Sequence, residues 1–242
     1  MTVPDMTDAL LKLDRARKHI NDLEIKISSF LNTDFYRLSI EPDEGNTSAL
    51  VKLETFHDVD KEINLILGDA VSNLRSSLDY AFIAVCKATT GIIDQGGFPF
   101  ANTENDLTGR INKTVPEAFK KCFFDHVKTY KGGAGHDLWL LNELRNTDKH
   151  RLLLTTVSIA GITADFVLGT NKFYNCTIGL TAGQTGYLIK APMGEFDLTK
   201  QPRPAFSVQI AEPPHAINVP VLPFLNFVHP QIESLFKRIT AL

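Results

Sequence analysis

Two long runs of apolar residues at helical spacing constrain this chain more than any other feature of its sequence. Over residues 6–31 and 58–88, apolar side chains return every three or four positions, which places them on one face of a helix. Such stripes must be buried, so they predict two long helices packed antiparallel. The apolar positions are Met6, Leu10, Leu13, Ala16, Ile20, Leu23, Ile27 and Phe30 in the first run, and Ile63, Leu67, Ala70, Leu74, Leu78, Ala81, Phe82 and Val85 in the second.

Two other parts of the chain have the pattern of β-strands. Phe35–Glu41 and Ala49–Phe56 alternate apolar and polar residues around a Pro-Asp-Glu-Gly-Asn turn, which predicts a hairpin. After residue 151, short β-branched and aromatic runs separated by Gly, Asn and Pro predict an antiparallel meander. These runs are Leu152–Ile159, Thr163–Leu168, Thr177–Thr181, Gly186–Ile189 and Ala205–Ile210.

The remaining segments complete the predicted fold. Residues 91–114 are rich in Gly, Asn and Asp, which predicts a loop that covers the core with two phenylalanines. Residues 116–126 predict a short helix that begins with proline. Helical spacing returns over 137–149 and 224–240, and these two helices are expected to join the bundle.

The expected fold class is α+β: an antiparallel helical bundle with a short β-hairpin and an antiparallel β-meander before the last helix. At 242 residues, 43% of them hydrophobic, the chain can bury a sizeable core. We expect one domain over 1–242, with a helical core of 1–151 and 216–242 and a β-rich insertion over 152–215. No apolar run approaches the roughly 20 residues that cross a bilayer, and the N-terminus lacks a signal pattern, so we expect a cytoplasmic protein without a membrane partner.

Residues 137–153 combine a leucine-rich helical stripe with a dense polar cluster. The cluster consists of Arg145, Asn146, Asp148, Lys149, His150 and Arg151. Between Arg110 and Arg151 there are nine Lys or Arg residues and five Asp or Glu, a net charge of +4, whereas the whole chain carries −3. This charge fits either a locally basic face around the cluster or an ordinary solvated helical face.

Arg145 and His150 are separated by four residues, with the polar Asn146 directly after the arginine and a leucine-rich helix before it. This arrangement resembles the Arg-x4–6-His motif of the HEPN superfamily of helical domains, many of which are metal-independent ribonucleases. The segment GDAVSNLRSSLDY at 68–80, followed by DKHR at 148–151, also resembles a pair of segments in uncharacterised bacterial proteins. The resemblance covers residues 59–90 and 137–152.

The resemblance implies an endoribonuclease that needs no metal or other cofactor, with Arg145 and His150 as its catalytic residues. An imidazole can take the 2′-hydroxyl proton or protonate the leaving oxygen, and an arginine can stabilise the charge that develops on the phosphate. The family also implies RNA as substrate, a homodimer in which two motifs meet, and 2′,3′-cyclic phosphate products. A toxin or defence role, restrained by a regulatory protein partner, follows from the same resemblance.

Asp69 and Asn73 lie on one side of the second long helix, where they either decorate the surface or hydrogen-bond the Arg145/His150 cluster, with Asn146, Asp148 and Lys149 in support. On a continuous helix, Asn146 and His150 share a face, whereas Arg145 lies about 140° away from His150. A helix that ends near residue 147 would be needed to bring the arginine and the histidine together.

The alternative function is a non-catalytic helical binding or interaction module with a structural motif. Arg145 and Asp148 would then form surface ion pairs, and His150 would cap the helix C-terminus. The sequence supports no other site, because its histidines are isolated and its three cysteines form no C-x-x-C pair. No metal site is therefore expected.

Overall fold

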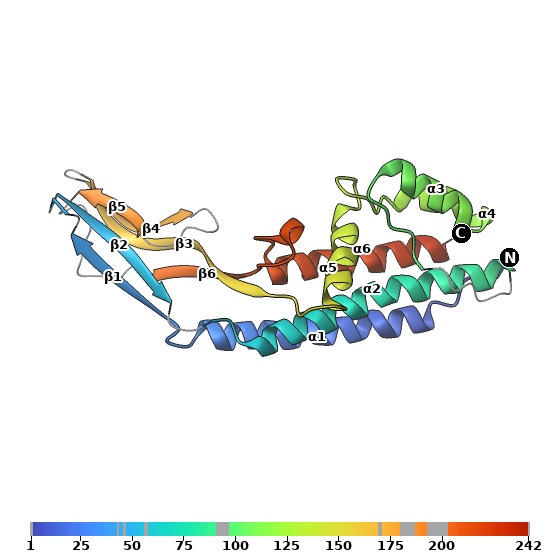
Figure 1. The fold of residues 1–242 in the computed structure, drawn as a ribbon, viewed down its shortest axis with the longest axis horizontal. Helices are drawn as coiled ribbons and strands as arrows, with labels where there is room; N and C mark the ends of the chain where they lie inside the picture. Colours follow the sequence, from blue (N-terminus) through green and yellow to red (C-terminus); the bar gives the residue numbers. More distant parts are fainter. Residues whose placement is uncertain are drawn as a thin grey trace.

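The computed structural model describes residues 2–42, 44–45, 47–55, 58–90, 97–168, 171–179, 187–192 and 203–241. Within them lie six α-helices, six β-strands and one short 3-10 helix. The helices are α1 (Thr7–Leu31), α2 (Lys61–Thr90), α3 (Glu104–Thr114), α4 (Glu117–His126), α5 (His136–Asp148), η1 (Pro214–Ala216) and α6 (Val221–Thr240). The strands are β1 (Tyr36–Pro42), β2 (Ser48–Thr55), β3 (Thr155–Leu168), β4 (Asn171–Gly179), β5 (Tyr187–Pro192) and β6 (Arg203–Ile210). Both chain termini lie at the end of the molecule opposite the strands (Figure 1).

Helices α1 and α2 lie side by side along the length of the helical part, as their apolar stripes predict (Figure 1). Leu23 of α1 and Leu67, Leu74 and Leu78 of α2 are fully buried. Helix α6 packs on both of them, and α5 crosses α2 and α6. The helices share one hydrophobic core, so the predicted bundle is confirmed.

The strands form two three-stranded antiparallel sheets, in the orders β1-β2-β5 and β4-β3-β6. The predicted α+β class is confirmed, but the strand order differs from a simple meander. Both β4 and β6 pair with β3, while β5 joins the β1–β2 hairpin. The two strands predicted within 152–168 form the single strand β3, whose pairing register shifts next to Gly161. A glycine within a strand often marks such an irregularity rather than an end.

Aromatic rings join the helical part to both sheets. Phe35, which follows α1, is fully buried and lies 4.9 Å from Phe30 of α1 between ring centroids. The same ring lies 4.8 Å from Phe206 of β6, which in turn lies 4.7 Å from Tyr36 of β1. One aromatic cluster therefore contacts α1 and a strand of each sheet.

The loop predicted over residues 91–114 is wrong in its second half, because residues 104–114 form α3. The Thr103 hydroxyl accepts a hydrogen bond from the Asp106 amide at 3.2 Å, which caps the helix, and Leu107 and Ile111 bury its apolar side. The sequence signal was the Thr-x-x-Asp pair. Residues 91–96, together with the predicted strand ends at 56, 180–181 and 186, lie outside the described residues. The expected covering role is confirmed for Phe98 and Phe100, which are both buried.

Truncation of the α2 stripe should destabilise the protein strongly. Leu74→Ala or Leu78→Ala removes a fully buried side chain and should lower the free energy of unfolding by about 2–5 kcal/mol. Leu65→Ala is the matched control, because Leu65 is on the same helix but 59% exposed, and its effect should stay within about 0.5 kcal/mol. Urea midpoints measure all three. Equal losses at Leu65 and Leu74 would contradict the assigned core face.

Candidate functional site

Helix α5 carries the motif, and its position is set by its apolar face. Leu138, Leu140, Leu141 and Leu144 are buried, and the helix contacts α2, α6 and η1. Because α5 crosses the long helices (Figure 1), its C-terminal end lies against α2 near Gly68. Arg145 therefore lies on a packed helix, and His150 lies in the turn that follows it.

Helical hydrogen bonding extends from the C-terminal end of α5 into the turn that carries His150. The helix ends at Asp148, but the Lys149 amide still donates to the Arg145 carbonyl at 3.2 Å. The amides of His150 and Arg151 both donate to the Thr147 carbonyl at 3.0 Å. Backbone hydrogen bonding of the helical kind thus reaches Arg151, and on an ideal helix the two motif side chains would leave the axis about 140° apart. Asn146, four residues before His150, lies on the histidine side.

The side chains of Arg145 and His150 form no hydrogen bond or ion pair within the described ranges. Arg145 is half-buried and His150 is exposed. The ion pairs that the structural alternative predicts for Arg145 and Asp148 are therefore not found there, and neither is a cap made by the His150 imidazole. Lys149 is also exposed. The motif offers a cationic and an imidazole side chain to a partner outside the chain.

The segment after the motif is anchored on α2. Asn64, which is 5% exposed, accepts hydrogen bonds from the Thr155 amide at 3.1 Å and from its hydroxyl at 2.7 Å. Arg151 pairs with Glu212 at 3.3 Å. The turn that holds His150 is consequently fixed on both sides, by α5 before it and by these contacts after it.

Asp148 packs against α2 so closely that a Cβ atom at Gly68 would lie 2.5 Å from its Oδ1. Burial raises the pKa of Asp148, and the nearby Asp69 carboxylate adds to the rise. The hydrogen bonds predicted between Asp69 and the cluster are not found among the described residues, where Asp69 acts on Asp148 as a nearby like charge. Asn73 donates to the Asp69 carbonyl at 2.8 Å within α2, so its amide is occupied inside its own helix.

A polar pocket of about 390 Å³ opens beside the motif helix. Its walls come from α2, the segment 97–102, α3 and α5, and Asn146 is the predicted site residue that lines it. The other polar side chains in its wall are Arg75, Asn102, Arg110, Trp139, Asn142 and Glu143. Sequence reasoning missed this pocket, although Trp139, Asn142 and Asn146 recur at helical spacing on α5 and were a usable signal.

Arg75 is the buried centre of the pocket wall. It is 8% exposed, its Nε donates to Asn142 Oδ1 at 2.8 Å, and its guanidinium pairs with Asp79 at 2.5 Å. The guanidinium also stacks on the Phe100 ring, 4.4 Å from the centroid. Burial lowers the pKa of Arg75, while Asp79 opposes this shift. Since arginine stays charged even so, a fixed cation lies at the pocket.

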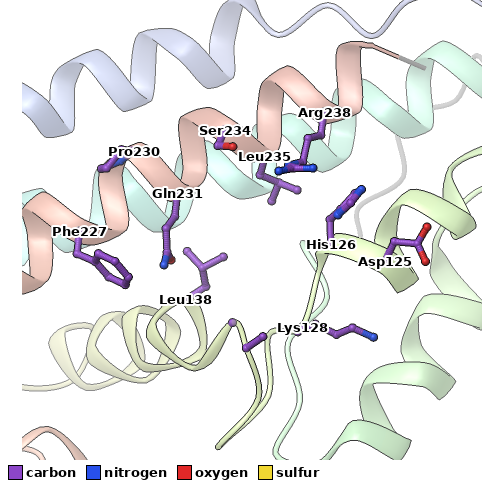
Figure 2. A pocket seen from close by; sticks show the side chains of 12 residues that line it. Asp125, His126, Lys128, Leu138, Phe227, Pro230, Gln231, Ser234, Leu235 and Arg238 are labelled. Carbon is purple, nitrogen blue, oxygen red and sulfur yellow. The ribbon is translucent and has the colours of Figure 1, made fainter.

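A second pocket, of about 500 Å³, lies between α4, the start of α5 and α6. It contains none of the predicted site residues. Figure 2 shows Arg238 and His126 toward one end and Phe227 and Gln231 toward the other. The pocket shares no lining residue with the polar pocket, so the two can be tested separately.

In comparisons with known proteins, no family model, curated protein or solved structure matches the chain. Among the described residues, no three His, Cys, Asp or Glu side chains are grouped to hold a metal ion. None of the described helices is long and apolar enough to cross a bilayer.

Asp148→Asn should stabilise the protein at neutral pH. The raised pKa means that the ionised carboxylate disfavours the fold, and this penalty disappears below the ordinary aspartate value of 3.8, where both states are protonated. The urea midpoint of the variant should exceed that of the wild type at pH 7, with a difference that shrinks toward pH 3. Asp22→Asn, on the exposed side of α1, should show no such gain. A gain at Asp148 that persists at pH 3 would contradict the electrostatic cause.

Proposed function

We propose that the protein is a HEPN-like, metal-independent endoribonuclease that cleaves RNA by transesterification. The observation that carries the proposal is that the side chains of Arg145, on α5, and His150, in the turn after it, form no ion pair or hydrogen bond in the described part of the chain and follow a polar pocket that Asn146 lines. Catalytic side chains that no other residue of the chain engages are able to contact a substrate. The toxin or defence role and a restraining protein partner belong to the same proposal.

The chemistry requires one base, one acid and one cation. The 2′-oxygen attacks phosphorus after losing its proton to an imidazole, and the bond from phosphorus to the 5′-oxygen breaks as that oxygen is protonated. The products are a 2′,3′-cyclic phosphate and a 5′-hydroxyl. In this scheme the His150 imidazole takes the proton of the 2′-hydroxyl and then gives a proton to the 5′-oxygen. The guanidinium of Arg145 binds the non-bridging oxygens of the phosphate through two parallel hydrogen bonds.

The angle between the two side chains argues for a homodimer. Because Arg145 and His150 would leave an ideal helix about 140° apart, one chain presents them poorly to a single phosphate. A two-fold axis that brings two copies of the motif together would place Arg145 of one copy opposite the partner's motif. Each phosphate site would then draw its arginine and its histidine from different chains.

The alternative is a non-catalytic binding module, which the hydrogen-bonded wall of the polar pocket favours. Arg75 and Asn142 hold each other in place there, as a preformed binding surface requires. In that case Arg145 and His150 contact the bound partner without cleaving it.

Single substitutions test the catalytic proposal. Arg145→Ala and His150→Ala should each abolish RNA cleavage measured in EDTA, because each removes a group that acts on the phosphate. Their thermal unfolding should stay close to that of the wild type. Arg15→Ala and His126→Ala are matched controls on exposed residues of α1 and α4 and should keep full activity. Variants purified in parallel that all cleave RNA at the wild-type rate would refute the proposal.

Mixed variants test the shared site. Arg145→Ala and His150→Ala chains, unfolded together and refolded as a mixture, should regain about one quarter of wild-type activity if each site uses both chains, because half of the dimers then hold one intact site. Sites contained within one chain would give no recovery. Loss of stability together with loss of activity in the single variants would assign both residues to structure and favour the binding module.

A further inference from the structure

The polar pocket beside α5 has the size and the walls of a small-molecule site. Its volume of about 390 Å³ falls within the roughly 300–1,000 Å³ of typical ligand pockets. Its wall is made of elements that packing has already fixed. Trp139, which is 4% exposed, forms part of it, and its indole N–H donates to Asn102 Oδ1 at 3.2 Å.

Some hydrogen-bonding side chains at this pocket are used, because other residues of the chain already pair with them, and others are unused. Arg75 is held by Asn142, Asp79 and Phe100, so it belongs to the used groups and its charge is paired with Asp79. The Glu143 carboxylate in the wall accepts a hydrogen bond from Asn142 Nδ2 at 3.2 Å. Within the described residues, the side chains of Arg110 and Asn146 form no hydrogen bond or ion pair. These two therefore offer a guanidinium and an amide to a ligand.

A nucleotide matches that set of groups. An amide carries a donor and an acceptor side by side, which pair with the edge of a nucleobase, and proteins read unpaired RNA bases in this way. A guanidinium binds a phosphate through two parallel hydrogen bonds. An aliphatic ligand would leave the Asn146 amide unused, and a purely anionic ligand would use only its donor.

We propose that the polar pocket binds one unpaired nucleotide of the substrate, with its base against Asn146 and an adjoining phosphate on Arg110. Asn146 lies in the last turn of α5 and lines the pocket, and His150 lies in the turn that follows α5, so the pocket wall reaches to within four residues of the imidazole along the chain. The pocket reads the base beside the cleaved bond and gives the enzyme a sequence preference. This inference rests on the proposed function and names what the same site recognises.

The chain contains a single tryptophan, Trp139, so its fluorescence reports directly on this pocket. Adenosine, guanosine, cytidine and uridine 5′-monophosphates, titrated one at a time, should produce a saturable change for at least one base. Inorganic phosphate should produce none. Calorimetry on the same samples gives a Kd that does not depend on the indole.

Arg110→Ala and Asn146→Ala should each raise this Kd about tenfold or more, since each removes hydrogen bonds to the ligand. Arg238→Ala is the matched control: it removes an arginine from the second pocket (Figure 2) and should leave the Kd unchanged. No binding of any nucleotide up to millimolar concentration would overturn the inference. Equal binding of inorganic phosphate, or weakening by Arg238→Ala alone, would also overturn it.

Monophosphates contain no internucleotide bond, so the two proposals can fail separately. Nucleotide binding at the pocket without cleavage of any RNA would keep the binding site and refute the ribonuclease. Cleavage that Arg110→Ala and Asn146→Ala leave unchanged for every RNA sequence would keep the ribonuclease and refute the base-reading pocket.

Discussion

The packing of α1 on α2 is the contact on which the rest of the molecule depends. Each fully buried leucine or isoleucine along it contributes roughly 1.5–3 kcal/mol, whereas an exposed ion pair such as Lys26–Asp60, at 3.2 Å, contributes little because water and salt screen it. The apolar stripes therefore decide the arrangement. Helix α6 packs on both long helices, and α2 also holds α5 through Arg75 and Gly68.

The burial of Arg75 is difficult to explain by stability. Replacing a buried ion pair by apolar side chains of similar volume is often neutral or stabilising. A leucine or methionine at this position would extend the apolar stripe of α2 at no cost in desolvation. What the arginine supplies instead is orientation: it fixes the Asn142 amide and places a positive charge at the wall of the polar pocket. Such a role agrees with the binding pocket proposed above.

The long helices could be predicted from the sequence because their apolar spacing is local information. The partner of β5 could not, since β5 pairs with β2 across more than 130 residues and neither strand specifies the other. Helix α3 was missed because its glycine and asparagine outweighed the Thr103–Asp106 cap.

Within the candidate site, sequence spacing identified Arg145 and His150 but not their relative direction, which depends on how α5 ends. The polar pocket escaped prediction for a different reason. Its walls come from α2, the segment 97–102, α3 and α5, so it exists only after the chain has folded. Asn146 belongs both to the predicted cluster and to the wall of this pocket.

The hydrogen bonds between Asn64 and Thr155 lie, along the chain, between the turn that carries His150 and the sheet that contains β3. Only residues 149–154 separate the end of α5 from the start of β3, a tether of at most about 20 Å when extended. The far side of that tether is tied to α2 by Asn64, and β3 pairs with both β4 and β6. A movement of β3 is therefore passed to the imidazole only after the hydrogen bonds between Asn64 and Thr155 break. These bonds separate the motif from movements of the strands.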